Sequence, residues 1–153
     1  CMSRTVTRLA GSAIAVAALA LTACSPVHTM DNYAASDGVR VELSKQVKAE
    51  NVLILASEEG ADARIVGGLT NNTNSDVEFT IGFVDGSSET IEVAARSTVL
   101  LDGSDERDVV LDDVPAGPGS TVDMSFSTPE LGASTYAVPV LDGTFAEYAD
   151  LVP

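Results

Sequence analysis

The feature that most constrains the fold of this chain is an alternation of apolar and polar side chains that begins at Val39 and recurs as far as Val140. In a β-strand, successive side chains point to opposite faces, so the alternation gives each strand one face suited to a core. Gly, Asn, Asp, Ser and Pro residues separate the apolar runs, as turns require. The runs lie at 39–43, 52–55, 63–69, 77–83, 91–93, 99–101, 109–111, 122–126 and 136–140. Their number and spacing predict an antiparallel β-sandwich of about nine strands.

Individual runs carry further detail about this sandwich. Residues 52–55 are apolar on both faces, so we expect them to form a central strand. Asp85-Gly86 is a strong hairpin signal, and 71–74 is rich in Asn, which favours a turn because Asn tolerates positive φ. Met124 shares the parity of Phe126, so it is expected to fill a gap in the core.

Helical signals are few. Within the sandwich the sequence suggests a single helical turn, around residues 44–50. The tail from Leu141 to Pro153 does not alternate and is not expected to be a strand. Its Phe145, Tyr148 and Leu151 recur at helical spacing, which predicts one turn docked on the sandwich.

The N-terminal stretch has the layout of a bacterial secretion signal. Arg4 and Arg8 precede an apolar run at 9–21, and no acidic residue occurs before Cys24. The run is shorter than the roughly 20 apolar residues that span a membrane. Leu-Thr-Ala-Cys at 21–24 then matches the bacterial lipobox, in which the cysteine thiol receives a diacylglycerol and the signal is cut just before it. An ordinary secretion signal and an uncleaved anchor are the alternative interpretations.

This interpretation divides the chain into a removed signal peptide at 1–23, a flexible lipidated tether at 24–38, and a sandwich domain with its docked tail at 39–153. Two acyl chains on Cys24 would anchor the protein stably, because each buried methylene contributes about 0.8 kcal/mol. The basic end of a signal stays cytoplasmic, so the domain is expected at the extracytoplasmic, periplasmic face of the cell membrane. Beyond the covalent diacylglycerol and N-acyl lipid, no cofactor is expected.

The balance of charge changes at Cys24. Two of the eight basic residues precede it, whereas all 23 acidic residues follow it, so the mature part is strongly acidic. Such a surface repels nucleic acid and anionic headgroups, and it favours solubility or a basic partner. Cys24 is also the only cysteine of the mature part, so the domain has no internal disulfide and depends on its core.

Metal ligands are scarce in this sequence. His28 and Met30 form a pair of the kind that binds Cu(I), since imidazole and thioether suit that ion. The pair lies in the tether, and His28 is the only histidine of the chain, so the two are kept as candidate ligands and no metal site is assigned. A blue-copper centre needs two His and a Cys thiolate, which the sandwich lacks. The carboxylates at 102–113 do not have EF-hand spacing, and solvated loop charge explains them better than calcium.

The sequence does not favour an enzyme. The domain has no histidine for general-base work and no free thiol. Ser–Lys chemistry would need Lys45 or Lys48, which we expect on an exposed face. A carboxylate pair of the glycosidase kind stays open as an alternative, although the chain has no Trp for the flat platform usual in sugar sites. The expected function is therefore a non-catalytic one.

Motifs spread over most of the mature chain carry a resemblance to a known family. They are the lipobox, the segment Val39-Arg40-Val41 that leads into residues 51–55, and the separate segments 67–72, 116–119, 138–143 and 147–149. These motifs are turn and strand signatures rather than catalytic ones. With them the chain resembles the mycobacterial LpqE-like lipoproteins and their corynebacterial counterparts, which are small actinobacterial cell-envelope lipoproteins.

The resemblance implies an immunoglobulin-like or cupredoxin-like sandwich of about seven to nine strands. Some members are peripheral subunits on the outer face of the cytochrome bcc–aa3 respiratory supercomplex. The resemblance therefore implies a protein-binding accessory module, with cytochrome bcc–aa3 subunits as the candidate partner. The alternative is an envelope lipoprotein that handles copper or another metal. The family offers no catalytic residues that would transfer to this chain.

Overall fold

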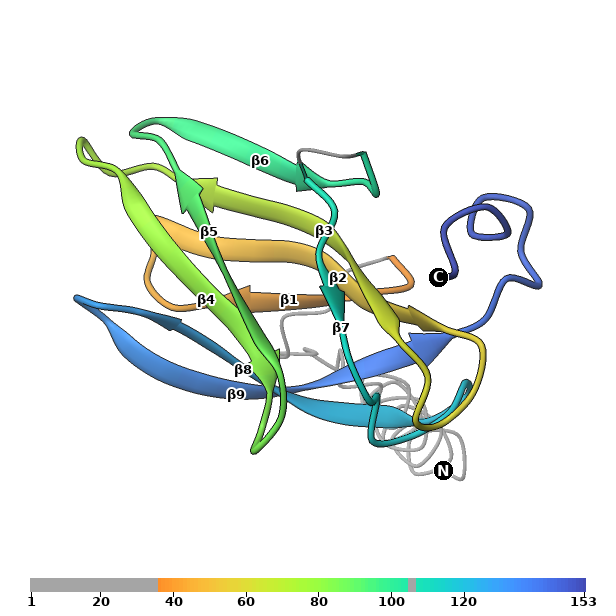
Figure 1. Cartoon of the computed structure of the whole chain (residues 1–153). Coiled ribbons are helices and arrows are strands. Elements are labelled where there is room, and N and C mark those ends of the chain that lie inside the picture. The colour runs from red at the N-terminus through yellow and green to blue at the C-terminus, as the bar shows by residue number, and fades with distance from the viewer. Residues whose placement is uncertain (1–35, 105–106) are drawn as a thin grey trace, which may run out of the picture. The chain divides into compact units, whose positions relative to one another are not determined.

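The computed structural model describes residues 36–104 and 107–153, and its regular structure in these ranges is entirely β-strand (Figure 1). The nine strands are β1 Val39–Glu42, β2 Val47–Ala56, β3 Ala63–Asn71, β4 Val77–Phe83, β5 Ser88–Val93, β6 Ser97–Leu101, β7 Val110–Leu111, β8 Thr121–Thr128 and β9 Gly132–Leu141. Each predicted apolar run lies on one of them, so the all-β fold class is confirmed. Within the described ranges, no helix has the length and apolar character to cross a membrane. The predicted signal peptide and residues 24–35 of the predicted tether lie outside these ranges.

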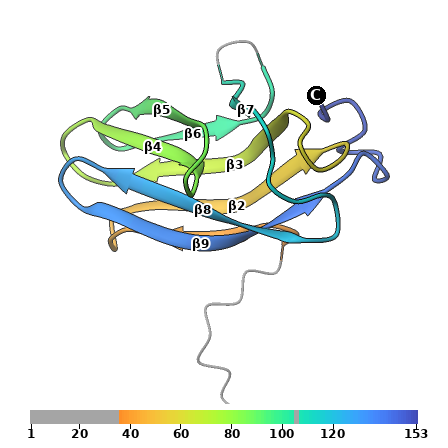
Figure 2. The same ribbon diagram turned by 60° about the horizontal axis from the view of Figure 1, so that its bottom comes forward.

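The strands form two sheets (Figures 1 and 2). In the first, β2 and β3 are the long central strands, with β1 beside β2 and with β6 and β7 along the other edge of β3. The second has the order β5-β4-β8-β9 and is antiparallel throughout. We call them the β2–β3 sheet and the β4–β8 sheet. This arrangement makes the domain a sandwich, as expected.

One strand joins the two sheets. The end of β9 leaves the β4–β8 sheet and pairs in parallel with β2, through Ile54 with Val140 and Leu55 with Leu141. This differs from the purely antiparallel order that the sequence suggests. The cause is that β1 is short and pairs with β2 only as far as Val52, which leaves the rest of that edge unpaired. The end of β9 supplies hydrogen-bond partners to this stretch of backbone.

The core is one continuous cluster of apolar side chains drawn from both sheets. Ile54 and Ile65 enter it from the β2–β3 sheet, and Met124 and Phe126 from the β4–β8 sheet, all four without exposed surface. Tyr136 packs edge-on against Phe126, with ring centroids 6.1 Å apart and planes at 82°. The core position predicted for Met124 is therefore confirmed, which leaves its thioether inaccessible as a ligand.

The helical turn predicted at 44–50 is wrong, because a hairpin turn at 44–46 leads directly into β2. The Ser44 hydroxyl accepts hydrogen bonds from the backbone N–H groups of Gln46 (3.2 Å) and Val47 (3.1 Å). Serine favours turns through such local bonds, which compete with helix formation. Pairing with β1 on one side and β3 on the other then holds the start of β2 as a strand.

The turn expected at 71–74 connects β3 to β4, but its physical cause differs from the predicted one. None of these four residues has a positive φ. Instead, the fully buried side chain of Asn71 organises the turn. Its amide nitrogen donates to the carbonyls of Ser75 (2.8 Å) and Val93 (3.0 Å), and its oxygen accepts from the N–H of Thr73 (2.9 Å). A buried amide with all of its partners fixes the loop to the end of β5.

Candidate functional site

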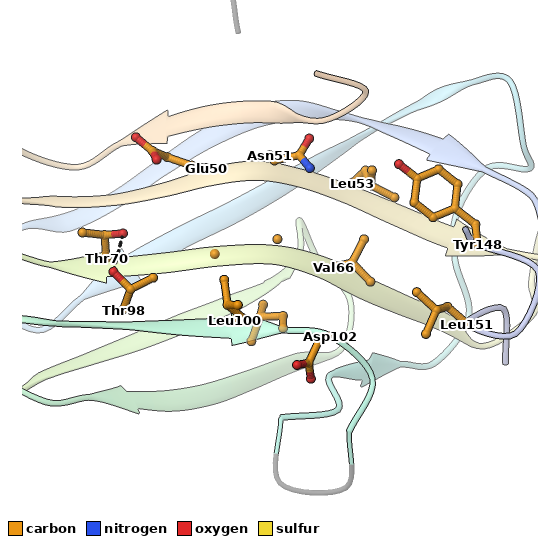
Figure 3. A pocket seen from close by; sticks show the side chains of 13 residues that line it. Glu50, Asn51, Leu53, Val66, Thr70, Thr98, Leu100, Asp102, Tyr148 and Leu151 are labelled. Atoms are coloured by element: carbon orange, nitrogen blue, oxygen red, sulfur yellow. Dashed lines mark hydrogen bonds between the residues drawn. The ribbon is translucent and has the colours of Figure 1, made fainter. Parts of the chain in front are cut away.

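The outer face of the β2–β3 sheet carries an open groove of about 420 Å³, which we call the outer groove (Figure 3). It is lined by Glu50, Asn51, Leu53, Val66, Gly67, Gly68, Thr70, Thr98, Leu100, Leu101, Asp102, Tyr148 and Leu151. These residues come from three neighbouring strands and from the C-terminal tail. Most of the lining is apolar, so the groove suits an apolar side chain or chain segment of another molecule.

A β-bulge shapes the floor of the outer groove. Two residues of β2, Asn51 and Val52, stand opposite one residue of β3, Gly67, where the register shifts. Asn51 accordingly has a φ of +53° and Gly67 a φ of +147°. A Cβ on Gly67 would lie 3.1 Å from backbone atoms of β2, so glycine is needed at this position.

The neighbouring glycine, Gly68, leaves the floor bare without being required by the backbone. A Cβ there would meet Leu100 Cδ2 at 3.5 Å and Thr98 Cγ2 at 3.9 Å, which are ordinary contacts. Leu100 rises beside this bare floor and is 54% exposed (Figure 3). The hydroxyls of Thr98 and Thr70 are 3.1 Å apart and hydrogen-bonded. An exposed leucine over a floor without side chains is a feature suited to contact with another molecule.

The C-terminal tail covers the other end of this sheet face. Three apolar residues of the sheet form a small outer cluster, Leu53, Leu55 and Val66. Leu141 at the end of β9 packs on it, together with Tyr148, Leu151 and Val152 of the tail. The tail makes two successive turns, in which Tyr148 N–H donates to the Phe145 carbonyl (3.0 Å) and Leu151 N–H to the Tyr148 carbonyl (2.9 Å). The predicted docking of Tyr148 and Leu151 is therefore confirmed. Phe145 does not join it, since it is 55% exposed and packs edge-on against Tyr148.

Arg64 of β3 fastens the tail to the sheet. Its guanidinium donates to both carboxylate oxygens of Asp108, at 2.6 Å and 2.9 Å, and to the carbonyl oxygen of Leu151. The side chain of Arg64 is only 15% exposed, and the contact with Asp108 raises its pKa. Two-pronged contacts of this kind fix geometry as well as charge. One arginine thus holds the β6–β7 connection and the tail together.

The first described residues of the chain reach the domain beside the outer groove. The N–H of Gly38 donates to the side-chain oxygen of Asn51 at 2.9 Å, and the hydroxyl of Tyr148 donates to the Asp37 carboxylate at 3.0 Å. Burial, and then the bond to Asp37, raise the pKa of Tyr148. Asn51 and Tyr148 both line the groove. The segment that enters the domain is therefore bound to the walls of the groove.

The charged groups at the groove are two carboxylates, one on each side. Glu50 receives Lys48 Nζ at 2.7 Å, and this contact, helped by Arg40, lowers the pKa of Glu50. Asp102 accepts from the hydroxyl of Ser104 at 2.8 Å, which lowers the pKa of Asp102. Both carboxylates are thus held ionised at neutral pH. Their pKa values move away from the range useful to a general acid or base.

The structure describes only some of the site residues that the sequence predicts. Cys24, His28 and Met30 lie outside the described residues, so the lipidation and metal predictions for them stay predictions. Of the carboxylates at 102–113, Asp108 serves as the partner of Arg64. Within residues 36–104 and 107–153, no three His, Cys, Asp or Glu side chains are grouped as a metal ion would need.

Sequence reasoning did not identify Leu100 and Gly68 as site residues. The alternation shows that Leu100 and Leu101 point to opposite faces, but it does not show which face stays uncovered. A signal was present in Gly67-Gly68, because adjacent glycines inside a strand mark a bulge or a close approach.

Comparison with known proteins gives a fold and no family. No protein-family model matches the chain, and no curated protein matches it. Among solved structures, the domain is similar to the apo PCuAC domain from PmoF1, with a TM-score of 0.51 and 13% identity over 62% of this chain and 92% of that one. The copper-bound PCuAC domain from PmoF2 has a TM-score of 0.48 and 17% identity, over 63% and 93% of the two chains. At such identities the first likeness shows a shared, cupredoxin-like fold, and the second is too distant to add to it.

Proposed function

We propose that this chain is a non-catalytic envelope lipoprotein whose sandwich domain binds another protein through the outer groove. The observation that carries the proposal is the exposed Leu100 above the bare floor at Gly68, at a point where no segment of the described chain covers the sheet. The groove offers no general acid at neutral pH, because the pKa values of its two carboxylates are lowered and the described residues include no His or Cys.

The predicted lipid on Cys24 fits this role. Eleven residues lie between Cys24 and Ser36, and the extended chain from one to the other spans about 40 Å. Asp37 and Gly38 then join the domain at the walls of the groove. A domain on such a tether meets proteins of the same membrane at a high effective concentration, so a modest contact surface suffices. The resemblance to LpqE-like lipoproteins suggests cytochrome bcc–aa3 subunits as the partner.

The proposal is tested by purifying the lipidated protein in mild detergent through a C-terminal tag and identifying the bound proteins, with a haem spectrum of the eluate. We expect a membrane protein in stoichiometric amount, bound by the wild type and lost in Leu100→Asp. The matched control is Val84→Asp, since Val84 is a similarly exposed apolar residue (46%) away from the groove. Equal capture by all three proteins would refute a role for the groove, and an eluate without haem would remove the respiratory partner.

The anchor has its own test. Replacing Cys24 with Ala removes the thiol that would carry the lipid, so we expect the protein to move from the membrane to the soluble fraction. Metabolic labelling with a fatty acid is expected to mark the wild type and not the variant. Retention of unlabelled Cys24→Ala protein in the membrane would contradict lipidation.

Copper handling is the second candidate, and the fold comparison favours it over a respiratory subunit because the similar structure is a PCuAC domain. The ligands do not favour it. The described residues contain no His and no Cys, and the thioether of Met124 has no exposed surface. Copper carried by this chain would therefore depend on His28 and Met30, and the domain itself does not fit a Cu(I) site.

A Cu(I) titration in competition with a chromogenic chelator separates the two candidates. The soluble Cys24→Ala protein is compared with the same protein carrying His28→Ala and Met30→Ala. Under the protein-binding proposal, neither protein competes for copper. Tight, stoichiometric binding that disappears in the triple variant would establish the copper-handling function instead.

A further inference from the structure

A second concave site lies at the end of the sandwich where three turns meet, away from the outer groove. We call it the end pocket, and its volume is about 400 Å³. The β1–β2, β3–β4 and β8–β9 turns form it, and Figure 1 shows these three turns at the same end of the sheets. Asn71 and Ser44 fix two of these turns through their hydrogen bonds. The pocket therefore has walls that are held in place before any ligand arrives.

The end pocket combines an apolar lining with an acidic rim. Val77 and Leu131 contribute apolar surface beside the buried Val47, and Leu131 is 47% exposed although it is a large hydrophobic residue. Asp76, Glu78 and Glu130 supply carboxylates, and none of the lining residues is basic. Lys45, on the β1–β2 turn, is exposed and is not part of the lining.

One carboxylate of this rim, Glu78, faces a like charge on the next strand, outside the pocket lining. Glu78 of β4 stands directly opposite Glu92 of β5 in the antiparallel register, and both are exposed. Like charges directly opposite each other destabilise a strand pair. The neighbouring pair on the same two strands shows the usual solution, since Thr80 and Thr90 hydrogen-bond to each other at 3.0 Å. A cation bound at Glu78 would relieve the repulsion, whereas an anion or a neutral group would not.

From these observations we infer that the end pocket binds a basic side chain of the partner protein, an arginine whose aliphatic stem lies on Val77 and Leu131 and whose guanidinium reaches Glu78 and Glu130. Arginine suits the site because it carries an apolar stem and a planar head that pairs with carboxylates. The surplus of acidic residues on the mature chain also favours a basic partner. This inference rests on the proposal that the domain binds a protein, and it names the chemistry that the partner presents.

The test uses a small probe, so that it does not depend on finding the partner. Nα-acetyl-arginine amide is titrated into the soluble Cys24→Ala protein and followed by amide chemical shifts. We expect weak, saturable shifts at 73–78 and 128–131. Nα-acetyl-citrulline amide, which has nearly the same shape without the charge, is expected to produce none. Equal shifts from citrulline, or arginine shifts spread over the acidic surface without saturation, would overturn the inference.

Two variants localise the effect. Glu78→Gln with Glu130→Gln is expected to weaken arginine binding at least tenfold, while Glu58→Gln with Glu59→Gln, two exposed carboxylates between β2 and β3, leaves it unchanged. Asp76 is kept, because its carboxylate accepts from the Ala95 N–H at 2.8 Å and supports the turn. Equal weakening by both pairs would reduce the effect to overall charge and defeat the inference. A failure here would leave the Leu100→Asp result intact, so the two proposals can fail separately.

Discussion

The two faces of the β2–β3 sheet are covered in different ways. Its inner face meets the β4–β8 sheet, and side chains such as Ile54 and Ile65 have no exposed surface there. Its outer face carries the small outer cluster under the tail at one end and the bare floor at Gly68 at the other. The inner face is thus covered by strands of both sheets, whereas the outer face is covered only in part, by the C-terminal tail that Arg64 and Tyr148 attach.

The comparison distinguishes the residues that stabilise the fold from the residues that determine how much of the outer face is exposed. Inner side chains pack against residues from every strand, so removing one of them destabilises the whole domain. The tail is attached by Arg64, by Tyr148 and by a few apolar contacts, so we expect it to detach more easily than any strand of the sandwich. Detachment would enlarge the exposed area of the outer face.

The largest effect is expected from the core between the two sheets, which the inner face of the β2–β3 sheet shares with Phe126 of β8. Phe126→Ala removes a fully buried ring and leaves a cavity, so the free energy of unfolding should fall by about 3–5 kcal/mol. Unfolding of the soluble Cys24→Ala protein in urea, with and without Phe126→Ala, measures the change in free energy. Phe145→Ala, at a ring that is 55% exposed, is the matched control and should change stability by less than about 0.5 kcal/mol. Similar losses in the two variants would contradict the dependence of stability on the core between the sheets.

Arg64→Met is expected to release the tail. It removes the contact with Asp108 and the bond to the Leu151 carbonyl, at a cost of about 1–2 kcal/mol because the site is partly exposed. Hydrogen exchange at 144–153 should become fast while β2 and β3 stay protected. Arg96→Met, which loses exposed bonds to Asn74, serves as control. Simultaneous loss of protection in tail and strands would show that the tail is part of the cooperative core.

Tyr148→Phe should weaken the same attachment by about 0.5–1.5 kcal/mol, because it deletes the hydroxyl that donates to Asp37 and keeps the ring on the outer cluster. We expect faster amide hydrogen exchange at the neighbours of Tyr148 and at Asp37, and unchanged protection of the core strands. A wild-type exchange pattern would mean that the bond to Asp37 contributes nothing to docking.

The same tyrosine predicts a smaller, pH-dependent effect. The folded-state pKa of Tyr148 is raised, so its stabilising contribution is complete below the unfolded value of about 10 and is lost as pH rises through the folded pKa. The difference in stability between wild type and Tyr148→Phe should therefore shrink above about pH 10. Unfolding curves of both proteins at several pH values measure this difference. The other tyrosines are present in both proteins, so their contributions cancel. Parallel pH profiles would contradict it.

The smallest effect on stability is expected at Gly68. A Cβ at this position makes only ordinary contacts, so Gly68→Ala should leave the domain as stable as before or more stable by less than about 1 kcal/mol. Gly67→Ala is the matched comparison, since its Cβ would press on the β2 backbone at a positive φ and destabilise the bulge. Loss of partner binding in stable Gly68→Ala protein would place the contact on the groove floor.

Much of the sandwich was predictable because alternation is a local property of the sequence. The strand from Val77 to Phe83 has its predicted bounds, and Asp85 occupies the hairpin with a φ of +64°. The parallel pairing of β9 with β2 was not predictable, since it depends on the length of β1, a distant strand. The outer groove escaped prediction for a related reason. Which outward residues the tail covers is decided by long-range contacts such as Arg64 with Leu151.

The bond between Tyr148 and Asp37 ties the segment that enters the domain to the segment that leaves it. A mechanical load applied to the chain ahead of Ser36 therefore reaches this bond and the Gly38–Asn51 bond before it can peel β1 from β2. These two contacts bear the load first, and the tail takes up part of the force that would otherwise act on the edge strand.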